Sequence, residues 1–226
     1  MDAQGQTGFV IWLTGMKGSG KSTLARHLHH RFAVARRPAE LLDADDPGEI
    51  LTRDLGATRE DRDASVRRIG RVAQLLARHG VVAVCASLSP FRDSREAVRR
   101  EIRRFVEVFV DCPMEVLITR DPVYKKALSG EVKGVPGVDD PYEPPTHPDL
   151  TVRSDEEPAE GASRRIFQAL VDLKYVGPSE FGRLTGGARP RRTRPVHKKA
   201  VGRALVRKAP KRIAARTAQA AGKGRR

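Results

Sequence analysis

Residues 8–23 read GFVIWLTGMKGSGKST, and this stretch decides the fold. Its first half is an apolar run that ends in glycine, as in a buried parallel strand that enters a turn. Its second half fits the phosphate-loop pattern G-x-x-x-x-G-K-[ST] at Gly15–Ser22, and a helical pattern follows. Glycines in such a loop let backbone N–H groups surround a phosphate, and the helix N-terminus adds partial positive charge. The predicted nucleotide-binding loop consists of Gly15, Met16, Lys17, Gly18, Ser19, Gly20, Lys21, Ser22 and Thr23.

Side chains in and near this loop predict the chemistry of the site. Lys21 is expected to bridge the β- and γ-phosphates of ATP, and the Ser22 hydroxyl is expected to ligate Mg²⁺. Asp43 and Asp45 follow a second apolar run, at a strand end that lines the ligand crevice of a doubly wound sheet. One carboxylate could hold a Mg²⁺-bound water and the other could orient or deprotonate an acceptor hydroxyl, or either could simply cap the next helix. The pattern predicts an ATP-dependent kinase.

Apolar strand-like runs alternate with helical patterns along the first three quarters of the chain. The runs lie at residues 8–15, 39–43, 81–87, 105–111 and 149–153. Helical patterns lie at residues 21–34, 59–78, 92–103 and 159–173, and a short one starts at Pro113. A loop rich in Gly and Pro spans residues 121–148. This alternation predicts an α/β fold, a three-layer doubly wound parallel sheet of about five strands.

The net charge of +15 belongs to the C-terminal end of the chain. Residues 178–226 hold 16 Lys or Arg and a single acid, Glu180, so the preceding 177 residues are neutral overall. We interpret residues 1–177 as a kinase domain and residues 178–226 as a basic tail that is disordered or conditionally helical. Such a tail could bind nucleic acid or another polyanion without sequence specificity, or it could simply be solvated.

The remaining composition points to a cytoplasmic protein without membrane contact. No apolar run approaches the length that spans a bilayer, and the first residues lack the basic and small-residue features of a signal peptide. The two cysteines, Cys85 and Cys112, lie at or near the ends of apolar runs and are too far apart for a CxxC site. We expect both to be buried, reduced thiols.

The order of motifs resembles the adenylylsulfate (APS) kinase family. The resemblance covers residues 8–175 and rests on GMKGSGKST at 15–23, LLDADD at 41–46, LTRDLG at 51–56, REDRDASVRRIG at 59–70, SLSPFRDSRE at 87–96, KALSGEVKGVPGVDDPYEPP at 126–145 and HPDLTVRSDEE at 147–157. It implies transfer of the γ-phosphoryl group of ATP to the 3′-hydroxyl of adenylylsulfate, which gives 3′-phosphoadenylylsulfate and ADP in sulfate activation. It also implies a homodimer.

The resemblance assigns roles to residues of this chain. The catalytic set that it implies is Lys21, Asp43, Asp45 and Ser89. The acceptor-binding set that it implies is Asp45, Arg62, Ser89, Pro90, Phe91, Lys126 and Lys133. The two lysines would arrive with residues 121–148, which resemble the family's lid. We favour direct in-line transfer, with Ser89 as a hydrogen-bonding group near the phosphates rather than a phosphoserine intermediate.

Four positions depart from the family pattern. Gly48 stands where the family has arginine, Ser65 where it has asparagine, and Ala57 and Val135 where it has aromatic residues that sandwich the acceptor's adenine. Loss of a stacked ring costs about 1–3 kcal/mol per base. The resemblance of the whole domain keeps adenylylsulfate as the leading acceptor. The four departures leave another small hydroxyl-bearing nucleotide conjugate or metabolite as the alternative.

Several arginines are further candidates for binding anionic groups, although most arginines on charged helices are simply solvated. These candidates are Arg62, Arg67, Arg68, Arg92 and Arg95.

Overall fold

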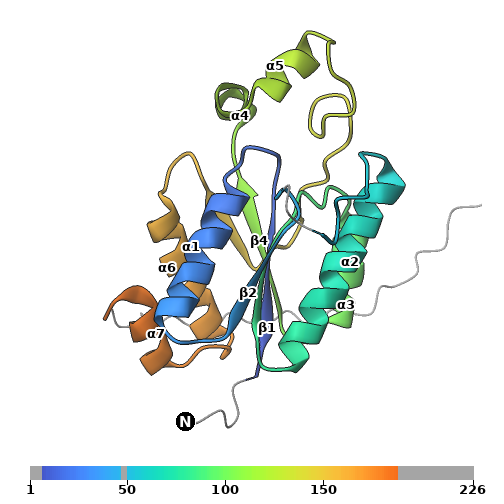
Figure 1. The fold of residues 1–226 in the computed structure, drawn as a ribbon. Coiled ribbons are helices and arrows are strands. Elements are labelled where there is room, and N and C mark those ends of the chain that lie inside the picture. Colours follow the sequence, from blue (N-terminus) through green and yellow to red (C-terminus); the bar gives the residue numbers. More distant parts are fainter. Residues whose placement is uncertain (1–6, 47–49, 188–226) are drawn as a thin grey trace, which may run out of the picture. The chain divides into compact units, whose positions relative to one another are not determined.

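A computed structural model describes residues 7–46 and 50–187 of the chain. Within them, five parallel strands form one sheet in the order β2-β3-β1-β4-β5 (Figure 1). The strands are β1 (Phe9–Thr14), β2 (Ala39–Asp43), β3 (Val82–Ala86), β4 (Phe105–Asp111) and β5 (Leu150–Arg153). The chain runs from β1 to β2 at one edge of the sheet, and the connection from β3 to β4 later crosses β1. The direction of the connections thus reverses beside β1, so the ligand crevice of this topology is expected at the carboxyl end of β1. The predicted doubly wound sheet is confirmed.

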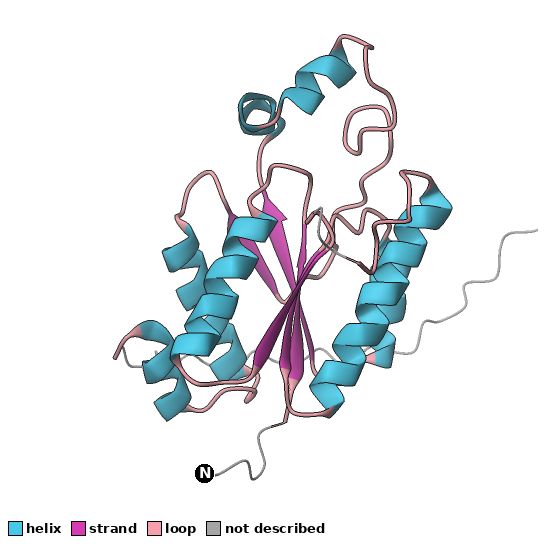
Figure 2. Cartoon of the chain, viewed as in Figure 1, coloured by secondary structure: helices cyan, strands magenta, loops and turns pink. Residues whose placement is uncertain are grey.

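Helices cover both faces of the sheet and one end of it (Figure 2). One face carries α1 (Lys21–Val34), α6 (Ala159–Asp172) and α7 (Pro178–Thr185), and the other carries α2 (Arg59–Arg78) and α3 (Arg92–Glu101). Two short helices, α4 (Met114–Arg120) and α5 (Pro122–Leu128), lie beyond the carboxyl ends of the strands (Figure 1). Among the helices that the structure describes, none is long and apolar enough to cross a membrane.

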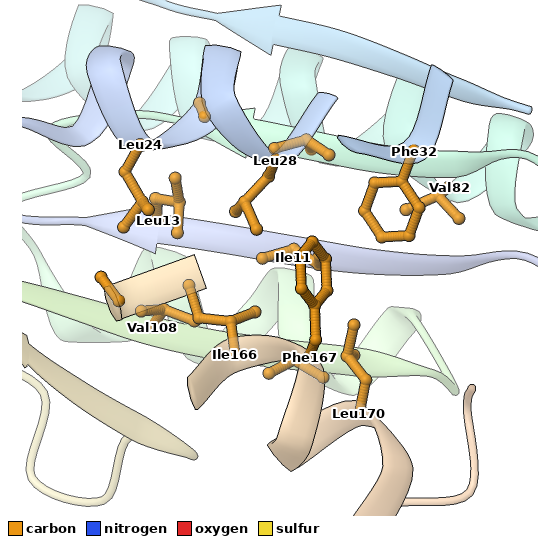
Figure 3. Packing of buried hydrophobic residues seen from close by; sticks show 14 of the residues in the cluster. Ile11, Leu13, Leu24, Leu28, Phe32, Val82, Val108, Ile166, Phe167 and Leu170 are labelled. Atoms are coloured by element: carbon orange, nitrogen blue, oxygen red, sulfur yellow. The ribbon is translucent and has the colours of Figure 1, made fainter. Parts of the chain in front are cut away.

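The central strand β1 packs side chains on both faces, because successive residues of a strand point to opposite sides. Ile11 and Leu13 face the layer of α1 and α6, where Leu28 and Phe167 meet them (Figure 3). Trp12 faces the opposite layer and is fully buried. Burial on both sides explains why the strand sequence is continuously apolar.

Local signals position α2 and α3 beside the sheet. The Thr58 hydroxyl caps α2 by accepting a hydrogen bond from the backbone N–H of Asp61 (3.2 Å). Gly70 lets α2 approach α3 closely, since a Cβ atom there would lie 2.7 Å from Cγ2 of Val98. The two helices therefore form one layer behind the loops that follow β2 and β3.

The C-terminal boundary of the folded body differs from the expectation of a tail that starts at residue 178. Residues Pro178–Thr185 form α7, with Phe181 1% and Leu184 0% exposed in the main core. Nε of the buried Arg37 lies 3.7 Å from Oε1 of Glu180 and fixes the helix further. Two apolar residues three apart are enough to form one short buried helix face. So few apolar residues give only a weak helical pattern in a basic sequence. Residues 188–226 of the expected tail lie outside the described residues.

The prediction for the cysteines is confirmed. Cys85 and Cys112 are both buried and both free. Burial raises the pKa of the Cys85 thiol, so this side chain behaves as a small apolar group.

Candidate functional site

The phosphate loop connects the carboxyl end of β1 to the first turn of α1. Gly15 lies against the carbonyl oxygen of Val110 in β4 so closely that a Cβ atom would collide with it. Only glycine lets the loop leave the sheet along this path. The Ser19 hydroxyl inside the loop is buried and has no hydrogen-bond partner among the described residues. The loop therefore presents backbone and one free hydroxyl in the geometry that suits a bound phosphate.

Lys21 reaches across this loop. Its side chain is 2% exposed, and Nζ donates to the carbonyl oxygen of Met16 (3.0 Å) and lies 3.6 Å from Oδ2 of Asp45. Burial lowers the pKa of Lys21, and the negative charge of Asp45 opposes this shift. The ammonium group is thus held by weak partners at the centre of the loop, where anionic phosphates would stabilise its charge.

The two predicted carboxylates occupy different environments. Asp43 is buried, and its Oδ1 accepts a hydrogen bond from the Ser22 hydroxyl (3.1 Å). A hydroxyl and a carboxylate side by side are the hard oxygen ligands that Mg²⁺ prefers, so this pair fits the ion. The side chain of Asp45 is 41% exposed and borders a pocket. The structure therefore separates a metal-side carboxylate from a pocket-side carboxylate.

This pocket, which we call the β2–β3 pocket, opens beyond the ends of β2 and β3 and has a volume of about 200 Å³. It is lined by Ala44, Asp45, Thr52, Leu55, Gly56, Ala57, Arg62, Ser65, Ser87, Leu88, Ser89 and Pro90. Four predicted acceptor residues lie among them, together with two of the positions that depart from the family pattern. Phe91 is buried next to the pocket, with the Arg59 guanidinium 4.1 Å above its ring.

A second pocket of about 300 Å³, the β4–β5 pocket, opens on the other side of the phosphate loop. It is lined by Gly18, Gly20, Thr23, Leu24, Val110, Arg120, Val152, Ser154, Glu157, Pro158, Ala159 and Ala162. Arg120 fixes one wall, because its guanidinium donates to the Ser154 hydroxyl (3.0 Å) and carbonyl oxygen (2.9 Å). Gly18, Gly20 and Thr23 belong to the predicted nucleotide-binding loop. We did not predict Arg120 and Ser154, although Ser154 follows the carboxyl end of β5, where ligand contacts are expected.

Comparison with known proteins identifies the family. A family model described as adenylylsulphate kinase matches residues 7–153. The chain belongs to the adenylylsulphate kinase family. It is 46% identical over 173 residues to an adenylyl-sulfate kinase of Rippkaea orientalis, covering 76% of this chain and 96% of the relative. It is 49% identical over 169 residues to that of Myxococcus xanthus, covering 72% and 91%.

A solved structure of the family supports the fold. The APS kinase of Mycobacterium tuberculosis, in complex with AMPPNP and APS, aligns with a TM-score of 0.69 and 32% identity. The alignment covers 74% of this chain and 99% of that chain. An APS kinase of similar architecture thus holds both nucleotides at once.

Ser89, whose hydroxyl we expect near the phosphates, lies beside the strand end that leads into the phosphate loop. The residue is 2% exposed, and its Oγ accepts from the indole N–H of Trp12 (3.2 Å) and donates to Oγ1 of Thr14 (2.9 Å). Its φ of 35° is unusual for a residue other than glycine. Polar partners on the underlying strand β1 hold the hydroxyl in place, and Ser89 lines the β2–β3 pocket beside them.

Arg62 connects the β2–β3 pocket to residues 114–148, a segment that contains the loop expected as a lid (121–148) and that we call the lid. Its Nε donates to the carbonyl oxygen of Ala57 (2.8 Å), and Nη2 donates to that of Gly134 (2.9 Å). The same Nη2 lies 3.4 Å from Oδ2 of Asp140. Arg62 therefore borders the pocket and contacts the lid at two points.

The lid contains its own apolar cluster rather than an irregular loop. Leu117, Tyr124 and Val135 are buried together there, and Val135 does not line the β2–β3 pocket. Lys126 and Lys133 are exposed, and the structure brings neither of them to that pocket. The predicted irregular loop at 121–148 is wrong for α5, since Pro122 starts this helix and the Asp121 side chain caps it. Gly48 lies outside the described residues.

The other arginine candidates divide into exposed and buried ones. Arg67 and Arg68 are exposed on α2, where Nη1 of Arg68 pairs with Asp54 (2.6 Å). Arg95 is 2% exposed and its Nε pairs with Oε1 of Glu107 (3.1 Å). Arg67, Arg68 and Arg95 line neither pocket. Arg92 is half-buried at the start of α3, next to the wall of the β2–β3 pocket.

Proposed function

We propose that this chain is an adenylyl-sulfate kinase, which transfers the γ-phosphoryl group of ATP to the 3′-hydroxyl of adenylyl sulfate. The observation that carries the proposal is the Lys21–Asp45 pair, 3.6 Å apart, at the point where the phosphate loop meets the β2–β3 pocket. A phosphate-binding ammonium and a pocket-facing carboxylate are thereby neighbours. Membership of the adenylylsulphate kinase family supports this acceptor over others.

The donor side uses the loop and the β4–β5 pocket. The backbone of residues 15–23 would hold the phosphates of ATP, with Lys21 between the β- and γ-phosphates. The nucleoside would extend into the β4–β5 pocket, where Arg120 and Pro158 offer a planar cation and an apolar surface. In this arrangement the γ-phosphate would point toward Asp45.

Mg²⁺ would be held by the Ser22 hydroxyl, with Asp43 accepting from that hydroxyl or from a metal-bound water. The bound ion would neutralise charge on the phosphates. Nη1 of Arg26 lies 3.7 Å from Oδ2 of Asp43 and helps to hold this buried carboxylate in place.

The acceptor side uses Asp45 and the wall at Ser87–Pro90. Asp45 would accept the proton of the 3′-hydroxyl as the bond from its oxygen to Pγ forms and the bond from Pγ to the β-phosphate oxygen breaks. ADP leaves, and the proton passes from Asp45 to solvent. The Ser89 hydroxyl is bonded to Thr14 and Trp12, which favours direct transfer over a phosphoserine intermediate.

The test is product analysis with the full chain. Purified protein, Mg²⁺ and ATP are incubated with adenylyl sulfate, AMP, adenosine and other nucleoside sulfates or phosphates, and products are separated by chromatography and weighed by mass spectrometry. We expect ADP and 3′-phosphoadenylyl sulfate in equal amounts, and none from Lys21→Ala. Turnover of a different acceptor, with none of adenylyl sulfate, would refute the proposal.

A second candidate keeps the reaction and changes the acceptor. Ala57 and Ser65 both line the β2–β3 pocket, where the family pattern has an aromatic ring and an amide. Smaller side chains leave room for a different hydroxyl-bearing nucleotide conjugate. The same panel decides between the two acceptors.

Three expectations about the whole protein stay predictions. Sedimentation equilibrium tests the homodimer, and fractionation of cells tests the cytoplasmic location. Nucleic-acid retention at two salt concentrations, for the full chain and a chain ending at Gly187, tests whether residues 188–226 bind a polyanion.

A further inference from the structure

Glu143, at the end of the lid, is bonded to the wall of the β2–β3 pocket through three separate groups. Its backbone N–H donates to the carbonyl oxygen of Pro90 (2.9 Å). Its carbonyl oxygen accepts from Nη2 of Arg95 (2.6 Å). Its carboxylate Oε2 accepts from the backbone N–H of Arg92 (2.8 Å). Hydrogen bonds at Glu143 therefore fix the end of the lid to the pocket wall and to helix α3.

Arg95 extends this attachment to the pocket wall itself. The buried guanidinium donates through Nη1 to the carbonyl oxygen of Ser89 (2.6 Å) and through Nε to Oε1 of Glu107 (3.1 Å). One cation thus joins the lid end, the wall and strand β4. Because Ser89 has a positive φ of 35°, the surrounding contacts must hold it in this conformation.

The carboxylate of Glu143 also completes helix α3. The N-cap residue of α3, Phe91, offers no side-chain hydrogen bond to the first free N–H groups. Glu143 supplies an anionic acceptor to one of them from the lid, where the helix end carries partial positive charge. Its negative charge therefore stabilises the start of α3, directly after the wall residues Ser89 and Pro90.

We propose that Glu143 is a positioning residue for the acceptor, because its hydrogen bonds from the lid hold the wall of the β2–β3 pocket in place. This inference rests on the proposed function, in which that pocket takes the acceptor. The donor site is attached to the lid elsewhere, through the Tyr124 hydroxyl and the carbonyl oxygen of Lys17 (2.8 Å). Loss of the Glu143 carboxylate therefore weakens acceptor binding and leaves ATP binding intact.

The experiment compares Glu143→Ala and Glu143→Gln with the wild type, after the panel assay has identified the acceptor. Kinetics are measured with each substrate varied in turn. Glu143→Ala is expected to raise the acceptor KM about tenfold and to change the ATP KM less than about twofold, as expected for loss of a charge-assisted hydrogen bond. Glu143→Gln keeps an oxygen acceptor for the Arg92 N–H but loses the charge, so it is expected to recover only part of the loss and to leave the acceptor KM about threefold above wild type.

Glu131→Ala is the matched control, since Glu131 is an exposed lid carboxylate bonded to Ser129 nearby. We expect wild-type constants for it. An unchanged acceptor KM in both Glu143 variants, or an equal rise in both KM values, would overturn the inference. If Glu143→Ala does not fold, calorimetric titration of Glu143→Gln with the acceptor in the presence of ADP decides, and wild-type affinity there refutes the role of the charge. A wild type that lacks turnover of adenylyl sulfate overturns the proposed function instead.

Discussion

The hydroxyl of Tyr124 in lid helix α5 donates a hydrogen bond of 2.8 Å to the carbonyl oxygen of Lys17 in the phosphate loop. Tyr124 is 1% exposed, and Met16 packs against the same lid cluster. The Nζ of Lys17 also lies 3.5 Å from Oδ2 of Asp121 at the start of α5. The donor loop and the lid thus share a buried contact, so the lid supports the loop that binds ATP.

Tyr124→Phe should weaken ATP use without changing the fold. It leaves the Lys17 carbonyl oxygen without its buried donor, a loss of about 1–3 kcal/mol. We expect kcat/KM for ATP to fall about tenfold in steady-state kinetics. Tyr175→Phe is the control, since Tyr175 packs on Phe9 at the opposite end of β1. Equal losses in the two variants would contradict a specific role for the Tyr124 hydroxyl.

Ser22→Ala should change the metal dependence of the reaction. The substitution removes the hydroxyl that lies 3.1 Å from Asp43 and that we assign to Mg²⁺. We expect the Mg²⁺ concentration for half-maximal rate to rise at least about tenfold, because one of the ion's protein contacts is lost. ATP affinity measured with EDTA present should stay close to wild type. Ser129→Ala, on the lid surface, is the control and should leave the Mg²⁺ titration unchanged. An unchanged titration in Ser22→Ala would contradict the assignment of Ser22 as a metal ligand.

ATP affinity is expected to fall at high pH, where Lys21 loses its proton, and Asp45→Asn should move this fall to lower pH. Burial lowers the pKa of Lys21, and the Asp45 charge partly restores it. The Lys21 charge is present below its pKa and is lost as pH rises through it, so removal of the Asp45 charge brings this loss to lower pH. Calorimetric titration with ATP across a neutral to alkaline series measures the effect. Asp54→Asn, which removes an exposed carboxylate paired with Arg68, should keep the wild-type profile. A shift to higher pH in Asp45→Asn would contradict the assignment.

Phe181→Ala should destabilise the whole domain. Phe181 is 1% exposed in the main core, so its truncation is expected to lower the free energy of unfolding by about 3–5 kcal/mol. Urea unfolding measures this change. Leu128→Ala is the control, since Leu128 is 60% exposed and its loss should cost less than about 0.5 kcal/mol. A similar small effect for Phe181→Ala would mean that α7 does not belong to the cooperative core.

The sequence predicts the sheet and the donor loop well, because both depend on local pattern. Buried parallel strands are continuously apolar, and the spacing of Gly15, Gly20 and Lys21 is specific. The positions of Asp43 and Asp45 follow from strand β2, since parallel strands end at one edge of the sheet. These features need no knowledge of long-range contacts.

Other features depend on contacts between distant segments, which the sequence does not reveal. The Ser89 hydroxyl turns inward because Trp12 and Thr14 offer partners on another strand. Arg95 looks like one more charged residue on a charged helix, yet it is buried against Glu107. Helix α7 carries only two buried apolar residues in a basic sequence, so its pattern is weak before α1 and α6 are in place.

Trp12 gives the pocket wall a natural optical reporter. It is the one tryptophan of the chain, it is fully buried, and its indole N–H is bonded to the Ser89 hydroxyl. Tryptophan emission from this protein therefore has a single source, and that source is bonded to Ser89, a residue of the pocket wall. Movement of Ser89 when a ligand enters will alter the hydrogen bond and the polarity around the indole. Stopped-flow fluorescence can thus follow acceptor binding in real time on the unlabelled enzyme.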